Sequence, residues 1–491
     1  MTSTSPSPND RLKPIVLCIT AASSYRLLRM VAEYLVRSGR CVIYLFDSPD
    51  NPVIETVRQE AAAMGIDVHA IADTVGASWT EPVLRGHPRP DAARKMDRLA
   101  RLAQAPRPSS SVGSLLVRLL WRSDLMLLRR HREQLGARLA AAVAWLRKVE
   151  AAAVVVSEDG IAAPLPILTA ARHLGVAVID VPYGYGVRRD LELALQAKAQ
   201  RHALITLRGL CGAIVRWLAP QWIKQGEFAG AIMYPAPYIV AAESLGMTLR
   251  DAWIVHGGYS DRLCAESAQM RDLYLSEGVP AEKLILTGTP YCDTLLSGLA
   301  LMPEAAGALR QPRKIRGGRT RILVAWPPSY HDERGGRSEF ATYREMSVAI
   351  LGWLASLDAC DVTVSLHPAT LDVDRAAVEA TGVTLTQSYV IELIAAHDIF
   401  ITYFSSTIRW AIAAGKPVVN YDAYKLGLDV YRAAPGVFTV DAFSELQRLV
   451  LELSGSDDAF RKAAGRQIEV AEYWGTLDGS STARVAETIC G

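Results

Sequence analysis

Two adjacent carboxylates stand at the end of an apolar run near residue 155. Residues 152–160 read AAVVVSEDG, so Glu158, Asp159 and Gly160 follow the valines almost directly. Such a run is typical of a buried parallel strand that helices cover on both faces. Open α/β sheets bind ligands beyond the carboxyl ends of their strands, which is where the two carboxylates would lie. The stretch predicts a catalytic carboxylate or, more simply, an aspartate that caps the next helix.

A histidine-proline pair follows another predicted strand, residues 362–366. Proline disfavours helix at the residue before it, so His367 would stand in extended backbone with Pro368 at the strand end. An imidazole there can donate to a phosphate or protonate a leaving oxygen. The alternative is a histidine that makes only structural hydrogen bonds.

Three hydroxyl residues, Ser405, Ser406 and Thr407, separate a predicted strand at 399–402 from a predicted helix at 408–414. Their hydroxyl groups, together with the free backbone N–H groups of a helix start, could bind an anion. The alternative is a helix N-cap, which needs only one of the three.

Other polar, aromatic or glycine residues near predicted strand ends are candidate substrate contacts. One group follows a predicted strand at 176–181, and another follows a predicted strand at 253–255. We also predict a strand at 238–242 and helix over residues 188–225. The candidate contacts are Gly160, Tyr183, Tyr185, His256, Gly288, Tyr330 and His331.

Composition indicates a large globular chain with free thiols. The 491 residues are half hydrophobic and carry a net charge of +2, so nothing favours nucleic acid as a partner. Seven cysteines without a CxxC pair fit a reducing cytoplasm and give no metal-binding spacing. The polar N-terminus does not resemble a secretory signal, and no apolar run is long enough to cross a membrane. The basic helical stretch 115–149 is either a solvated arginine face or a contact with an anionic membrane surface.

Alternating strands and helices predict an α/β protein with two Rossmann-like parallel-sheet domains. We expect a disordered tail at 1–13, an N-terminal domain at 14–307 with helical insertions, a linker at 308–319 and a C-terminal domain at 320–491. If the two sheets face each other across a cleft, the first motif would supply a base for an acceptor. The other two motifs would hold an anionic donor.

The ordered set Glu158-Asp159-Gly160, His367-Pro368 and Ser405-Ser406 resembles bacterial sialyltransferases and polysialyltransferases. Those enzymes have the two-domain GT-B fold and carry a [D/E]-[D/E]-G motif, an HP motif and a serine-rich motif. Outside the motifs the resemblance is one of architecture.

The resemblance implies a role for each matching residue. Asp159 would be the general base for the acceptor hydroxyl, with Glu158 supporting it. His367 would contact the donor phosphate and assist the departure of CMP. Ser405 and Ser406 would bind that phosphate, with Pro368 beside them and Thr407 as a weaker candidate. The implied partners are a CMP-sugar donor and a glycan or glycoconjugate acceptor, with no metal and no other cofactor.

Three other functions stay open at this point. Residues 278–293 and 405–422 are similar to a wider set of GT-B enzymes. This similarity allows a UDP-sugar or CDP-glycerol transferase, and it also allows a UDP-GlcNAc 2-epimerase-like isomerase. An epimerase should gather several carboxylates and histidines around one sugar, whereas the sequence shows a single acidic pair. The third alternative is a catalytically silent assembly subunit, which would not need all three motifs.

Overall fold

The chain divides into two compact units, each built around its own sheet. The computed structural model describes residues 13–71, 78–104, 115–184, 186–301, 319–329, 331, 335–367, 370–427, 431 and 433–491, without the side chains of 103–104, 115–123, 190 and 335. Unit 1 comprises Met1–Ala265, Leu273–Ile285 and Val485–Gly491, and unit 2 comprises Glu266–Asp272 and Leu286–Arg484. Of the predicted tail and linker, all but residues 13 and 319 lie outside the described residues.

Unit 1 contains a seven-stranded sheet in the order β3-β2-β1-β4-β5-β8-β9. The strand pairs from β3 to β8 are parallel, with Val16 opposite Val154 and Val156 opposite Asp180. Every residue of β1, β2 and β4 is buried, as expected where helices cover both faces of a sheet. The strands are β1 (Ile15–Cys18), β2 (Val42–Phe46), β3 (Asp67–Ala70), β4 (Ala153–Val156), β5 (Ala177–Asp180), β8 (Arg262–Ala265) and β9 (Leu284–Leu286).

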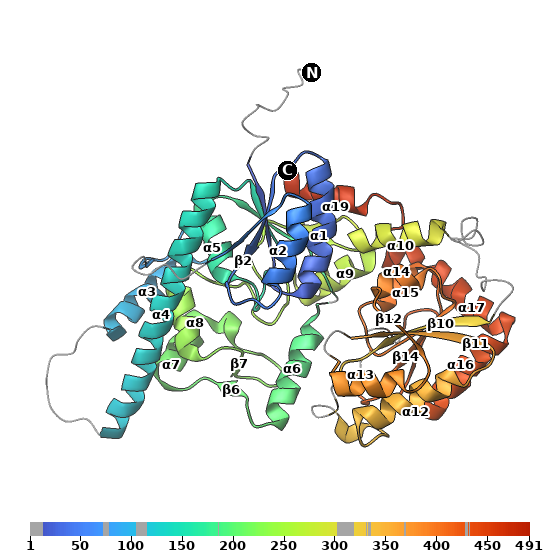
Figure 1. Ribbon diagram of the computed structural model, residues 1–491. Helices are drawn as coiled ribbons and strands as arrows, with labels where there is room; N and C mark the ends of the chain where they lie inside the picture. The colour runs from blue at the N-terminus through green and yellow to red at the C-terminus, as the bar shows by residue number, and fades with distance from the viewer. Residues whose placement is uncertain are drawn as a thin grey trace. The chain divides into compact units, whose positions relative to one another are not determined.

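The helices of unit 1 cover this sheet and extend beyond it. The long helix α4 packs against α5 and α8, and α3 and α7 join the same group (Figure 1). A short antiparallel ribbon of β6 (Ile205–Thr206) and β7 (Ala231–Ile232) lies between α6 and α8 in the chain. The helices are α1 (Ala22–Arg37), α2 (Ile54–Ala63), α3 (Pro90–Gln104), α4 (Leu115–Val149), α5 (Leu165–Leu174), α6 (Arg188–Gln200), α7 (Gly209–Leu218), α8 (Ala236–Ser244) and α9 (Ala268–Glu277), which spans both units.

Three sequence predictions in this region are wrong. The apolar run 238–242 belongs to the buried helix α8, because a short apolar run does not distinguish a buried strand from a buried helix. Residues 253–255 form turns, and the ring N–H of Trp253 donates to the Trp222 carbonyl at 3.2 Å. The helix predicted over 188–225 is interrupted before α7, where Gly209 has φ of +65° and β6 intervenes.

Unit 2 contains a six-stranded, wholly parallel sheet in the order β12-β11-β10-β13-β14-β15. Its core lies between this sheet and helices that include α12 and α16 (Figure 1). The strands are β10 (Thr320–Trp326), β11 (Cys360–Leu366), β12 (Thr384–Thr386), β13 (Ile399–Thr402), β14 (Val418–Tyr421) and β15 (Val437–Val440). The helices are α10 (Pro290–Ala300), α12 (Tyr343–Ala355), α13 (Asp372–Glu379), α14 (Val390–Ile394), α15 (Ile408–Ala413), α16 (Phe443–Gly455), α17 (Asp457–Ile468) and α18 (Ala471–Trp474), with α19 (Ser481–Cys490) ending in unit 1.

Both sheets reverse their strand order at one point. In unit 1 the chain runs outward from β1 to β3 and then returns to place β4 on the other side of β1. Unit 2 repeats this pattern with β10 and β13. Ligands of open α/β sheets bind at this reversal, beyond the carboxyl ends of the strands. Glu158 follows β4 and Ser405 follows β13, so both motifs lie at the reversal point of their own sheet.

A buried ion pair holds α15 in place directly after the Ser405–Thr407 segment. The Arg409 guanidinium donates twice to the Glu266 carboxylate, from Nε and from Nη2, both at 2.6 Å. The ring N–H of Trp410 donates to the same carboxylate at 3.0 Å. All three residues belong to unit 2, and this buried bidentate pair fixes the start of the helix.

Candidate functional site

The carboxylate of Asp159 is completely buried and fully engaged. It accepts hydrogen bonds from the backbone N–H groups of Gly258 at 3.0 Å and Ser260 at 2.8 Å. The ammonium group of Lys283, also buried, lies 2.5 Å from its Oδ2. Burial alone would raise the pKa of Asp159, but Lys283 outweighs it and holds the pKa at about 2. Asp159 therefore joins three segments of unit 1 as a permanent anion, and it is a poor proton acceptor.

Two glycines allow these segments to approach one another closely. A Cβ atom on Gly258 would lie 1.9 Å from the Asp159 carbonyl oxygen, and one on Gly160 would lie 2.2 Å from the Val255 carbonyl oxygen. Any side chain at either position would force the backbones apart. Gly160, a candidate substrate contact, is thus accounted for by packing under the 254–260 loop.

A second buried pair lies beside the first. His256 and Asp180 are 2.7 Å apart through Nδ1 and Oδ2, and both are buried. Burial by itself would lower the pKa of His256, but the Asp180 carboxylate outweighs it and the pKa is raised. The His256 ring also meets the Tyr274 ring edge-on, with centroids 4.9 Å apart. Asp180 ends β5, which pairs with β4, the strand that Glu158 and Asp159 follow.

Glu158 is the carboxylate of this cluster that reaches the surface. Its side chain is partly exposed, whereas Asp159 and Asp180 are fully buried. Burial raises its pKa to about 7, with Asp180 and Asp159 adding to the effect and His256 opposing it. A carboxylate with a pKa near neutrality, at the reversal point of an α/β sheet, has the properties of a general base.

The Lys283 ammonium group lies at one member of a cluster whose spacing could suit a metal ion. Ligand atoms of Asp159, Asp180 and His256 all lie within 4.8 Å of one another, a spacing that a metal ion could bridge. The Lys283 ammonium already supplies a positive charge at Asp159, and its donation to the His256 carbonyl at 3.1 Å fixes it there. A cation at Asp159 would therefore have to displace this ammonium group.

Sequence reasoning missed Asp180 and Lys283. Asp180 lies inside the strand predicted at 176–181. The observed strand β5 ends at Asp180, so this carboxylate also lies at the carboxyl end of a strand, as Glu158 does. Lys283 ends the 3-10 turn Ala281–Lys283, and only its burial distinguishes it from a surface lysine.

In unit 2, two predicted motifs lie at the same edge of the sheet. His367 follows β11 and is exposed, and Ser405 comes three residues after β13. The strands β11 and β13 flank β10, with Trp326 opposite Leu366 and Ala325 opposite Thr402. The imidazole and the serine hydroxyls therefore follow strands on either side of the reversal point.

The backbone before the serines is strained. Phe404 has φ of +38°, a region that non-glycine residues rarely adopt. Its N–H donates to the side-chain oxygen of buried Asn420 at 2.8 Å, which holds the turn. Strain of this kind persists where the surroundings impose it and is common at ligand sites.

The hydroxyl groups of this segment differ in availability. Thr407 is buried, and its hydroxyl donates to Ser405 Oγ at 2.8 Å. Ser405 and Ser406 are partly exposed. Because α15 has only six residues, its dipole adds little, and anion binding would depend on the two serines.

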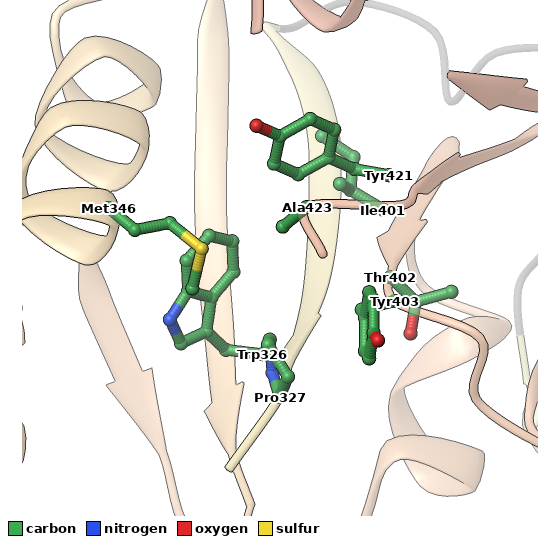
Figure 2. A pocket seen from close by; sticks show the side chains of 8 residues that line it. All are labelled: Trp326, Pro327, Met346, Ile401, Thr402, Tyr403, Tyr421 and Ala423. Atoms are coloured by element: carbon green, nitrogen blue, oxygen red, sulfur yellow. The ribbon is translucent and has the colours of Figure 1, made fainter. Parts of the chain in front are cut away.

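A small apolar pocket opens behind this edge (Figure 2). Its walls come from the last residues of β10, β13 and β14 and from α12. Trp326 and Met346 both line it, with Ile401 from β13 and Tyr421 from β14 (Figure 2). The lining is Trp326, Pro327, Met346, Ile401, Thr402, Tyr403, Tyr421 and Ala423.

The remaining candidates are dispersed. Tyr183 is partly buried in the loop after β5. Gly288, with φ of +79°, packs against Ser481, where a Cβ would come within 2.3 Å of Oγ. The Nε2–H group of His331 donates to the Phe340 carbonyl oxygen at 2.8 Å. Tyr185, Tyr330 and Pro368 lie outside the described residues.

Comparison with known proteins reveals the fold. No protein-family model matches the chain, and neither does any curated protein sequence. The calicheamicin glycosyltransferase CalG4 is 12% identical, with 98% of each chain covered and a TM-score of 0.50. The chain has the GT-B fold. The predicted α/β architecture with two parallel-sheet domains is thereby confirmed.

Two further solved structures cover almost the whole chain. UDP-GlcNAc 2-epimerase from Neisseria meningitidis, bound to UDP-GlcNAc, is 13% identical over 97% of this chain and 98% of its own, with a TM-score of 0.47. MurG from Acinetobacter baumannii is 12% identical over 97% and 99%, with a TM-score of 0.46. At such identities the likeness concerns the fold, and activity must be inferred from the site.

Proposed function

We propose that the chain is an inverting glycosyltransferase. It would move an acidic sugar (a sialic acid, another nonulosonic acid or a Kdo-like sugar) from a CMP-sugar to a hydroxyl of a surface glycan or glycoconjugate. The observation that carries the proposal is Glu158, a partly exposed carboxylate with a pKa near neutrality at the reversal point of a GT-B sheet. The choice of a CMP-linked donor rests on the resemblance of the three motifs.

Unit 1 would activate the acceptor. Ionised Glu158 takes the proton of the acceptor hydroxyl, and the oxygen attacks the anomeric carbon of the donor. Asp159 supports this step as a positioning residue, because its bonds to Gly258, Ser260 and Lys283 fix the turn that carries Glu158. This reverses the roles that the resemblance implied for the two carboxylates.

Unit 2 would bind the donor and stabilise the leaving group. As the new glycosidic bond forms, the bond from the anomeric carbon to the phosphate oxygen breaks and CMP departs with the electron pair. His367 would donate a proton or hydrogen bond to that phosphate, and the hydroxyls of Ser405 and Ser406 would donate to its oxygens. These groups can stabilise the charge of a nucleoside monophosphate, so the proposed step needs no metal.

The pH dependence of kcat/KM should follow the ionisation of Glu158. Because the base must be ionised, kcat/KM should fall about tenfold for each pH unit below a pKa of about 7 and level off above it. A profile of kcat/KM between pH 5 and 9 would show this limb. The limb should disappear in Glu158→Gln, and a limb that persists in that variant would assign the titration to another group.

Nucleotide binding tests the donor site without any acceptor. We expect calorimetry to show that CMP binds more tightly than UMP, UDP or CDP. His367→Ala and the double variant Ser405→Ala/Ser406→Ala should each weaken CMP binding by about tenfold or more, since each loses hydrogen bonds to a charged group.

Ser356→Ala is the matched control. Ser356 is an exposed residue of unit 2 whose hydroxyl donates to the Trp353 carbonyl at 2.7 Å within the same helix end, so CMP affinity should not change. Preference for UDP or CDP would overturn the CMP-sugar assignment. Equal weakening by all the variants would remove these hydroxyls from the donor site.

A UDP-GlcNAc 2-epimerase-like reaction is the second candidate. The sequence showed one acidic pair, but the structure gathers Glu158, Asp159, Asp180 and His256 in one cluster. Asp159 and Asp180 are buried in ion pairs, which leaves few groups for a two-base reaction and favours transfer. Incubation with UDP-GlcNAc in deuterium oxide decides between them, because epimerisation at C2 would exchange that hydrogen and transfer would not.

A further inference from the structure

Exposed apolar side chains are concentrated on one group of helices in unit 1. The helices α3, α4 and α7 pack against one another (Figure 1). Among the described residues of unit 1, all exposed large hydrophobic side chains lie on these helices, except Leu275 on α9. They are Leu102 at 73% exposure, Met126 at 68%, Leu127 at 43% and Trp217 at 70%.

These side chains are not the edges of a core. Each helix already buries other apolar side chains: Met96 on α3, Leu128 on α4 and Val215 on α7 are at most 1% exposed. Packing within the unit is therefore satisfied without the exposed set. A cluster of exposed apolar residues on neighbouring elements indicates a surface that contacts something else.

The same helices carry an excess of exposed cations. On α3, on α7 and its N-cap, and on residues 124–134 of α4, the exposed cations outnumber the exposed acids, which are Asp91 and Glu133. The chain as a whole has a net charge of only +2, so this excess is local. The cations are Arg94, Lys95, Arg98, Arg101, Arg129, Arg130, Arg208 and Arg216.

We infer that α3, α4 and α7 form a docking surface for a lipid bilayer that contains anionic lipids. Leu102, Met126, Leu127 and Trp217 would enter the boundary between headgroups and acyl chains, where tryptophan is favoured. The arginines would contact the lipid phosphates. Within the part of the chain that the structure describes, every helix is too short or too polar to span a bilayer, so the contact would be peripheral.

Charge favours a membrane over a second copy of the chain. A symmetric contact between two copies would bring the same patch together and oppose arginine with arginine. An anionic bilayer matches the positive charge and the apolar tips at once. The inference is independent of the proposed reaction, since none of these residues has a role in it.

Co-sedimentation of the full chain with vesicles tests the inference. One set of vesicles contains phosphatidylcholine alone, and the other contains about one third phosphatidylglycerol. The protein should bind the second set at low salt and be released as salt rises, because exposed charges are screened. Met126→Ser/Leu127→Ser and Trp217→Ser should each lower the apparent affinity by about tenfold or more.

Val348→Ser/Leu451→Ser is the matched control, because it removes two exposed apolar side chains from unit 2. Binding should be unchanged in that variant, and all variants should keep the circular dichroism spectrum and CMP affinity of the parent. Absence of sedimentation with anionic vesicles would overturn the inference, as would binding that the α4 and α7 variants leave intact. A dimer in solution that those variants dissociate would identify a second copy as the occupant instead.

Discussion

Replacing Glu158 by glutamine is expected to lower kcat for sugar transfer by about 100- to 10,000-fold. The amide has nearly the same shape as the carboxyl group, so acceptor and donor should still bind. It cannot take the proton of the acceptor hydroxyl at any pH. Initial rates of nucleotide release, measured over a range of donor and acceptor concentrations, would show the loss in kcat with little change in KM.

Glu282→Gln is the matched control for this experiment. Glu282 is an exposed glutamate of the same unit, next to Lys283 in the sequence, and its loss should leave kcat unchanged. Calorimetry with CMP should show that Glu158→Gln keeps a functional donor site. A kcat close to that of the parent would show that another group accepts the proton.

The position of the site could be predicted from local sequence, because the rule that identifies it is local. The valines before Glu158 indicate a buried parallel strand, and such strands present their following residues at the ligand edge. The same rule placed His367 after β11 and Ser405 after β13. The rule needs only the position of the strand in the sequence, which a run of β-branched residues indicates.

The roles of Glu158 and Asp159 could not be predicted in this way. The two residues are adjacent and chemically alike, and what distinguishes them is burial by Gly258, Ser260 and Lys283, more than ninety residues away in the chain. Such long-range contacts leave no trace in the pattern around residue 158. The same limit explains the wrong strand at 238–242, where tertiary burial of an apolar run decided in favour of helix.

Replacing Asp159 by asparagine is expected to have the largest effect on stability. Removing one partner of a buried ion pair typically costs about 3–5 kcal/mol, because the other charge stays buried without compensation. Here Lys283 would be left in that state. An amide also accepts poorly where two backbone N–H groups, of Gly258 and Ser260, converge on both carboxylate oxygens.

The pH dependence of stability should have a defined sign. The pKa of Asp159 is about 2 in the folded chain and lies below its ordinary value of 3.8. The ion pair therefore contributes its full stabilisation above about pH 4 and loses it as the pH falls toward 2. Calorimetric scans should show this loss in the parent chain and a much smaller one in Asp159→Asn.

A double-mutant cycle with Lys283→Met separates the pair from its surroundings. Lys283→Met alone should be less harmful than Asp159→Asn, because Asp159 keeps two backbone donors. The double variant should be more stable than the sum of the single effects predicts, since neither charge is then left alone. Additive effects would mean that the two groups do not form an ion pair in solution.

Replacing the two carboxylates should have opposite effects on activity and on stability. Glu158→Gln should abolish turnover in a chain that melts at or above the temperature of the parent, because it removes a carboxyl group that burial disfavours when charged. Asp159→Asn should melt far below the parent, and any activity it loses should follow the fraction unfolded. If Asp159→Asn instead stayed folded and lost all turnover, with Glu158→Gln still active, the base would be Asp159, as the family resemblance implied.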